Sequence, residues 1–340
     1  MKLMKTEDAV GQVICHDITQ IIKGVTKDAV FRKGHIITED DIPVLLSIGK
    51  DHIYIWENDE SMMHDNDAAE VLCAICRGSN IGRGEVKEGK IDLYAECDGV
   101  FRINREKLRA VNSFGQMMIA TRHGDFPVRK GAKLGGTRII PLVIEKEKME
   151  QARKTAGDEP ILEVEPYIFR RAGIVSTGNE VFYKRIKDEF TPVVKAKFEE
   201  YGAEIAGIRV SDDNTGNIEK CIKAFIEEGC DIVVCTGGMS VDPDDRTPHA
   251  IRNVCGSVVT YGAPVLPGAM FMLAYYGDSR IPVMGLPGCV MYTRRTVFDL
   301  VLPRIMTGEI LQKSDFDRMG EGGLCLNCEV CRFPDCSFGK

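Results

Sequence analysis

The sequence lacks the features of several protein classes. Aromatic residues make up only 7% of the 340 residues, but 44% are hydrophobic and 28% are charged, which excludes a disordered chain. Positive charge is not in excess, because 44 Lys and Arg face 51 Asp and Glu, and the net charge of -7 argues against nucleic acid as a partner. No run approaches the roughly 18 apolar residues of a membrane span, and acids precede any apolar stretch at the N-terminus. We therefore expect a cytoplasmic protein without membrane contact.

Cysteine is abundant, with thirteen in the chain, but its distribution does not fit a disulfide framework. Most cysteines are spread singly, which predicts reduced thiols in or near the core. The exception is a C-x2-C-x2-C-x4-C cluster formed by Cys325, Cys328, Cys331 and Cys336. The spacing is close to the C-x2-C-x2-C-x3-C run of ferredoxins, and four thiolates also satisfy tetrahedral Zn²⁺. The sequence thus predicts a metal centre and leaves open whether it holds Zn²⁺ or an iron–sulfur cluster.

The length predicts two or three domains, at about 100 to 200 residues each. Apolar runs and turn residues divide the chain into a small α+β unit (1–60), a β-rich domain with a linker (61–165), an α/β domain (166–306) and a flexible tail with the cysteine cluster (307–340). We expect a short helix over 41–48 and a linker over 151–160. A β-hairpin is expected to turn at Asp98-Gly99, between strands at 91–95 and 100–103.

From about residue 170 onward, short apolar strands alternate with amphipathic helices. The expected elements are strands at 173–176, 205–210 and 231–236, a helix from Thr191 to Gly202, and a helix from Asn214 or Thr215 to Gly229. Helices that join short strands force parallel pairing, and a parallel sheet must be covered on both faces. The sequence therefore predicts an α/β fold: a three-layer α/β domain with a mainly parallel sheet, preceded by a smaller α+β or β-rich region.

Ligands of open parallel sheets bind outside the carboxyl ends of the strands, so the loops that begin there matter most. The loops at that edge are 176–180, 236–245 and 285–288, with 266–268 between the last two. The paired glycines Gly237 and Gly238 allow backbone N–H groups to converge on an anion. The pattern is typical of a phosphate site, although each loop alone could be a tight turn.

Three acids follow the paired glycines, at Asp242, Asp244 and Asp245. These carboxylates would repel a phosphate unless a divalent ion bridged them, and loop carboxylates suit Mg²⁺. The sequence therefore predicts a phosphorylated small ligand held with Mg²⁺, with a solvated acidic loop as the alternative.

Three motifs carry a resemblance to a known family: T-G-x-E at 177–180, T-G-G-x-S at 236–240 with a trailing aspartate, and L-P-G at 286–288. They resemble the molybdopterin-binding domain of the molybdopterin molybdenumtransferase family. The resemblance implies binding of molybdopterin or its adenylated form, insertion of molybdate into the dithiolene with Mg²⁺, and a homo-oligomer. It implies catalytic acids at Asp245 and Asp188. The binding residues that it implies are Thr177, Gly178, Glu180, Thr236, Gly237, Gly238, Ser240, Pro267, Gly268, Pro287 and Gly288.

The sequence departs from the family pattern at several positions. Phe190 stands where the family has Asn, and Leu266 and Ala269 replace the two lysines of a K-P-G-K stretch. Two functions follow. The first is a transferase of molybdenum-cofactor biosynthesis, and the alternative is a carrier or insertion factor that binds the pterin without turnover and docks a molybdoenzyme.

Overall fold

The computed structural model describes residues 2–22, 26–55, 59–240, 242 and 245–340, which fall into two compact units. The first unit comprises residues 1–94, 103–122 and 133–163, and the second comprises 95–102, 123–132 and 164–340. The second unit therefore includes two short pieces from the N-terminal half of the chain. The contiguous boundaries expected from the sequence stay predictions. No helix of the described residues is long and apolar enough to cross a membrane.

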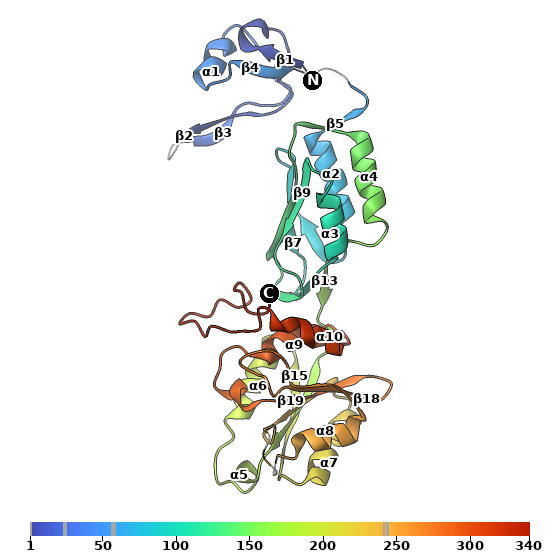
Figure 1. Ribbon diagram of the computed structural model, residues 1–340. Helices are drawn as coiled ribbons and strands as arrows, with labels where there is room; N and C mark the ends of the chain where they lie inside the picture. The colour runs from blue at the N-terminus through green and yellow to red at the C-terminus, as the bar shows by residue number, and fades with distance from the viewer. Residues whose placement is uncertain (1, 23–25, 56–58, 241, 243–244) are drawn as a thin grey trace. The chain divides into compact units, whose positions relative to one another are not determined.

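The second unit is built on a six-stranded sheet with the order β15-β14-β16-β19-β18-β17 (Figure 1). The first four of these strands run parallel, and β18 and β17 pair antiparallel at one end. The strands are β14 (Arg171–Thr177), β15 (Glu204–Ser211), β16 (Ile232–Thr236), β17 (Ser257–Tyr261), β18 (Met272–Tyr276) and β19 (Ile281–Leu286). This arrangement confirms the predicted α/β class and its mainly parallel sheet.

Helices cover both faces of the six-stranded sheet. Alternate residues of β16 point to opposite cores: Val233 and Cys235 pack with side chains of α7 and α8, and Ile232 and Val234 pack with those of α6 and α9. The two layers of helices are visible above and below the sheet in Figure 1. The helices are α6 (Phe190–Glu199), α7 (Thr215–Glu227), α8 (Thr247–Cys255) and α9 (Val297–Met306).

Helix α7 follows its sequence signals closely. The side chain of Asn214 accepts a hydrogen bond from the N–H of Asn217 at 3.3 Å, so it caps the helix as one of the two predicted residues. Phe225, on the buried face, lies over Gly173 of β14, where a Cβ atom would sit 2.4 Å from the ring. The close approach of helix to sheet therefore requires glycine at position 173.

The first unit contains a four-stranded antiparallel sheet with the order β6-β7-β11-β9. In it β7 pairs with β11, whereas β8 lies in a separate sheet with the order β10-β8-β13, whose strands belong mainly to the second unit. The hairpin predicted at Asp98-Gly99 was therefore wrong, because the chain leaves one sheet for another at that turn. The strands are β6 (Ile81–Arg83), β7 (Lys90–Ala95), β8 (Gly99–Ile103), β9 (Met117–Thr121), β10 (Phe126–Val128), β11 (Lys133–Ile139) and β13 (Leu162–Pro166).

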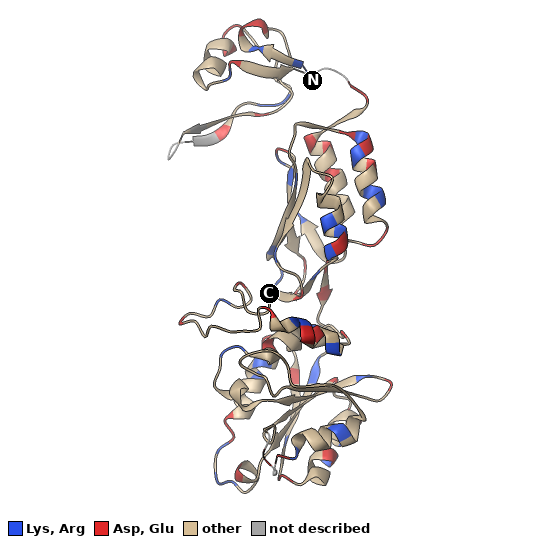
Figure 2. Cartoon of the chain, in the orientation of Figure 1, with Lys and Arg blue, Asp and Glu red and all other residues tan. Residues whose placement is uncertain are grey.

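The linker predicted over 151–160 was also wrong in its first half, where helix α4 (Lys146–Ala156) lies. The helix buries Met149, Ala152 and Ala156, a narrow stripe of which alanine forms the larger part. Lys, Arg, Asp and Glu colour much of the α4 ribbon in Figure 2. Because a stripe of small residues carries little hydrophobicity, the polar composition hid the helix. The other helices of this unit are α2 (Asp65–Cys76) and α3 (Arg105–Asn112).

The N-terminal residues form a small cluster of their own around Ile14, Phe31 and Leu45. Helix α1 (Asp41–Ser47) confirms the predicted short helix. The remaining elements of the first unit are β1 (Lys2–Lys5), η1 (Thr6–Asp8), β2 (Ile18–Ile22), β3 (Thr26–Phe31), β4 (His52–Ile55), β5 (Met62–His64) and β12 (Val143–Glu145).

The C-terminal segment is packed structure. It begins with α10 (Lys313–Asp317) and η3 (Arg318–Gly320), and Phe316 is fully buried with its ring stacked on Phe271 at 5.9 Å. Leu311 and Phe338 are buried in the same core. The flexible tail expected over 307–340 was wrong, because a few widely spaced apolar residues anchor this segment to the second unit.

Phe316→Ala should destabilise the folded chain by about 3–5 kcal/mol, since it removes a fully buried aromatic ring. Leu326→Ala, at a side chain that is 70% exposed, serves as the matched control and should change stability by about 0.5 kcal/mol or less. Urea unfolding of both variants measures the difference. Equal unfolding midpoints would show that α10 adds nothing to the core.

Candidate functional site

A buried hydroxyl joins the carboxyl ends of β14 and β16. The Thr177 hydroxyl donates to the carbonyl oxygen of Thr236 at 3.0 Å and lies 2.9 Å from the hydroxyl of Thr247, at the start of α8. All three threonines are buried. Thr177 and Thr236, both predicted to bind ligand, thus hold the ends of two strands in register.

The glycine loop, residues 236–240, is packed against these threonines. Gly237 and Gly238 have φ angles of 84° and 55°, in the left-handed region that favours glycine. A Cβ atom would lie 2.2 Å from the Thr177 carbonyl oxygen at position 237 and 2.8 Å from the Thr247 hydroxyl at position 238. The paired glycines therefore allow close packing, and the exposed Ser240 ends the loop at the surface.

Tyr261, at the end of β17, supports the glycine loop from the other side. Its hydroxyl lies 3.3 Å from the Met239 carbonyl oxygen and 3.4 Å from that of Ser240, and it donates to this pair. Burial raises the pKa of Tyr261, and the negative charge of Asp245 adds to the rise. Nothing in the sequence pattern indicated this contact.

The T-G-x-E loop is tied to the neighbouring strand β15. Gly178 donates its N–H to the Ser211 carbonyl oxygen at 3.2 Å, and the Asn179 N–H donates to an oxygen of the Asp213 carboxylate at 2.9 Å. Short helix α5 (Asn179–Phe182) follows, with the exposed Glu180 in its first turn. This contact brings the segment after β15 into the site.

Carboxylates crowd at this edge of the sheet. Burial raises the pKa of Asp213, and the negative charges of Glu180, Asp245 and Asp212 raise it further, against the opposing hydrogen bond from Asn179. Asp245 is half-buried and donates its N–H to the carbonyl oxygen of the exposed Asp242, whereas Asp244 lies outside the described residues.

Asp212 and Asp213 are functional candidates that the sequence reasoning missed. They directly follow β15, which ends at Ser211, one residue beyond the predicted strand, so the rule that ligands bind at carboxyl ends could have found them.

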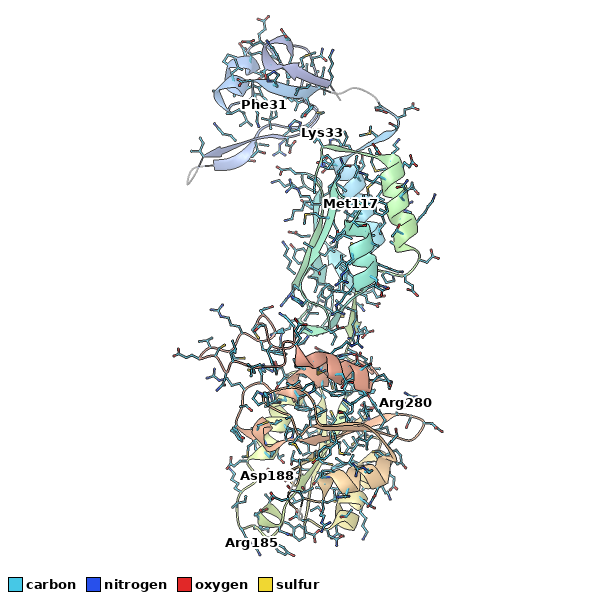
Figure 3. The ribbon with its side chains drawn as sticks, viewed as in Figure 1. Phe31, Lys33, Met117, Arg185, Asp188 and Arg280 are labelled. Atoms are coloured by element: carbon cyan, nitrogen blue, oxygen red, sulfur yellow. The ribbon has the colours of Figure 1, made fainter. Side chains whose placement is uncertain are left out.

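The carboxylate of Asp188 stabilises the start of helix α6. It accepts hydrogen bonds from the N–H groups of Phe190 and Thr191, at 2.9 and 3.0 Å, and from the Thr191 hydroxyl at 2.6 Å. Burial would raise the pKa of Asp188, but these bonds and one from Ser176 lower it below its usual value. Figure 3 labels Asp188 on the segment ahead of α6, which begins at Phe190, one residue before the start predicted at Thr191. Asp188, which was predicted to be a catalytic acid, therefore has a structural role at the start of α6.

The other two predicted loops, at 266–268 and 285–288, differ in how closely their glycines are packed. The Pro267 carbonyl oxygen accepts the N–H of Val297 at 3.1 Å, and a Cβ atom at Gly268 would lie 2.6 Å from the Val297 side chain. These two residues pack under the start of α9. Pro287 is buried ahead of η2 (Gly288–Met291), and Gly288 is exposed, with open space where a Cβ atom would lie.

The four clustered cysteines line one cavity of about 160 Å³ in the second unit. Cys328 and Cys331 are exposed, and Cys325 and Cys336 are half-buried. All thirteen cysteines of the chain are free thiols. Over the described residues, no three His, Cys, Asp or Glu side chains form a group arranged to hold a metal ion.

Asp213→Asn should raise the melting temperature at neutral pH. The pKa of Asp213 is raised in the folded chain, so its ionisation costs stability at neutral pH, and the amide removes that cost. The difference from the parent chain should grow between the ordinary Asp pKa and the raised one, and vanish below the ordinary value. Thermal melts over a pH series measure it. A variant that melts lower than the parent at neutral pH would contradict the crowding of carboxylates.

Comparison with known proteins bears on the second unit above all. Residues 173–307 match a family model described as a probable molybdopterin binding domain, and residues 3–57 match a domain of unknown function, DUF8806. A CinA-like protein of Mycobacterium tuberculosis is 36% identical over 86 residues, which are 25% of this chain and 20% of that protein. A CinA-like protein of Mycobacterium avium is 34% identical over 95 residues, 28% of this chain and 22% of that protein. The chain thus spans about a fifth of the length of the curated relatives that it matches.

Solved structures with a similar fold share little sequence. The molybdopterin biosynthesis enzyme MoaB of Thermus thermophilus is 22% identical, with 42% of this chain and 98% of that chain covered and a TM-score of 0.36. The protein CinA of Thermoplasma acidophilum, described as of unknown function, is 17% identical, with 35% and 89% covered and a TM-score of 0.31. The family match assigns residues 173–307 to the probable molybdopterin-binding domains.

Proposed function

We propose that this chain binds molybdopterin, or its adenylated form, at the carboxyl edge of the six-stranded sheet and inserts molybdate into the dithiolene with Mg²⁺. The observation that carries the proposal is the family match over residues 173–307, whose loops at that edge combine paired glycines with carboxylates. The resemblance of the T-G-x-E, T-G-G-x-S and L-P-G motifs points to the same ligand.

The glycine loop supplies the groups that a terminal phosphate needs. It packs against the start of α8, where Gly238 lies close to the Thr247 hydroxyl, so backbone N–H groups of the loop and of the first turn of the helix can donate to an anion. Ser240, exposed at the end of the loop, offers a hydroxyl as well. The Tyr261 hydroxyl fixes the loop backbone through two carbonyl oxygens and thereby keeps these donors in place.

A divalent cation would offset the negative charge of the carboxylates at this edge of the sheet. Burial raises the pKa of Asp213, and the negative charges of Glu180, Asp245 and Asp212 add to the rise, so a positive charge nearby would stabilise the ionised carboxylate. Asp245 and Asp213, with Glu180 beside them, would hold Mg²⁺, which supplies positive charge between the carboxylates and a ligand phosphate. The same residues without a cation would repel that phosphate.

The alternative, a carrier or insertion factor that binds the pterin without turnover, has its own support. The carboxylate of Asp188, implied as a catalytic acid, already accepts three hydrogen bonds at the start of α6. Phe190 stands where the transferase family has Asn. In this reading, the chain delivers its ligand to a molybdoenzyme.

Two further assignments belong to the proposal. We place the protein in the cytoplasm, because most of its cysteines are spread singly along the sequence, which is typical of reduced thiols. Oligomerisation, which the family resemblance implies, is to be measured by light scattering on the purified chain.

Turnover separates the two functions. Purified chain, adenylated molybdopterin, molybdate and Mg²⁺ should release AMP and yield molybdenum cofactor that activates an apo-molybdoenzyme. Tight pterin binding without AMP release supports the carrier. A chain that does not bind the pterin at all contradicts both.

Asp245→Asn should reduce the Mg²⁺-dependent step by at least about tenfold, because one of the carboxylates facing the cation is lost. Its melting temperature should not fall below that of the parent, because the substitution removes one of several like charges that lie near one another. The rate is measured as a function of Mg²⁺ concentration. Asp278→Asn, at an exposed turn before β19, is the control for charge alone. An unchanged rate in Asp245→Asn would remove this residue from the site.

Ser240→Ala should weaken pterin binding without a change in melting temperature, since the side chain is exposed. The loss of one hydrogen bond to a charged phosphate predicts roughly a tenfold to hundredfold weaker affinity. Titration followed by pterin fluorescence measures it. Ser279→Ala, at the exposed turn before β19, is the matched control. Equal affinity in both variants would place the phosphate away from the end of the glycine loop.

A further inference from the structure

The cysteine loop, residues 322–340, is held firmly against the second unit. Leu266 donates its N–H to the Gly323 carbonyl oxygen at 2.8 Å, and Cys325 donates its own to the Leu266 carbonyl oxygen at 2.8 Å. At the other end, the Gly339 N–H donates to the Gly322 carbonyl oxygen at 2.9 Å and closes the loop on itself. Figure 1 shows the loop, in red, as irregular backbone beyond α10.

Two arginines of the segment before α9 hold the middle of the cysteine loop. The Arg294 guanidinium donates to the carbonyl oxygens of Cys328, at 3.2 Å, and Glu329. The Arg295 guanidinium lies 4.9 Å from the centre of the Phe333 ring. Arg294 thus holds the loop backbone, and Arg295 packs on a side chain of the loop.

The walls of this cavity suit a thiolate-bound cluster. The four cysteines all line it, and Phe333 and Phe338 supply apolar surface. Of the lining residues, all of them described, three are arginines and none is acidic. Arg295 also pairs with Glu200 and Asp299 outside the lining, so its charge is partly compensated.

An iron–sulfur cluster needs more space between its cysteine ligands than a single Zn²⁺ ion does. Four sulfurs bound to Zn²⁺ lie about 2.3 Å from the ion and leave no space between them. The cavity that the four cysteines help to line has a volume of about 160 Å³. The consecutive C-x2-C-x2-C spacing is that of cubane clusters in bacterial ferredoxins.

We infer that Cys325, Cys328, Cys331 and Cys336 hold one [4Fe–4S] cluster in this cavity. The inference stands on the cysteine loop alone and does not depend on the pterin ligand. Arg294 is a positioning residue, since it holds the backbone between Cys328 and Cys331 and makes no bond to the cluster.

The test uses the full chain purified without oxygen. About four iron and four acid-labile sulfide per chain are expected, together with the brown colour of an iron–sulfur cluster. Cys328→Ala and Cys331→Ala, at exposed positions, should lose the iron, the sulfide and the colour. Cys97→Ala, at a half-buried cysteine outside the loop, should keep all three. Thermal melts check that each variant is folded.

The variant Arg294→Gln tests whether Arg294 holds the middle of the cysteine loop in place. It should retain the four thiols and release iron to a chelator several times faster than the parent, because the middle of the loop is no longer held. Release at the parental rate contradicts the positioning role.

Several results would overturn the cluster. One Zn²⁺ per chain without sulfide, neither zinc nor iron, or iron retained in both loop variants would each do so. Pterin titration of the same samples is independent: lost pterin binding with the cluster present counts against the proposed function and leaves the cluster inference intact.

Discussion

The geometry of the candidate site depends on one buried hydroxyl, that of Thr177. Burying a hydroxyl without a hydrogen bond is costly. The Thr177 hydroxyl is hydrogen-bonded both to the Thr236 carbonyl oxygen, at the end of β16, and to the Thr247 hydroxyl, at the start of α8. The carbonyl oxygen of Thr177 leaves room for nothing larger than hydrogen at Gly237. Two strands, a loop and a helix are therefore fixed relative to one another before any ligand arrives. A site preorganised in this way pays little conformational entropy on binding.

The α/β domain was predictable from the sequence because its signals are local and strong. Buried parallel strands are continuous apolar runs, and α7 carries an apolar face between a clear cap and a glycine. The glycine loop, Glu180 and Asp245 could be found because one rule places functional loops at the carboxyl ends of strands. The same rule applied to β15 would have added Asp213.

What the sequence could not reveal depends on contacts between distant residues. The partner of β7 is β11, some forty residues further along the chain, so the Asp98-Gly99 turn joins two sheets, although it has the pattern of a hairpin. Helix α4 buries two alanines, which carry little hydrophobic signal. Asp188 and Gly268 are residue types that are common in binding sites. Here Asp188 accepts a hydrogen bond from Thr191 at the start of α6, and Gly268 packs closely against Val297.

The second unit is assembled from widely separated parts of the chain. Arg102, from the N-terminal half, donates to the carboxylates of Asp125, Glu165 and Glu309, and Phe338 completes the core around α9. During synthesis on a ribosome, the sheet of this unit can pair long before these last contacts exist. The core can close only after residues up to Phe338 have left the exit tunnel. Until then, the nascent chain exposes apolar surface of α9, which makes it a client for chaperones that bind such surface.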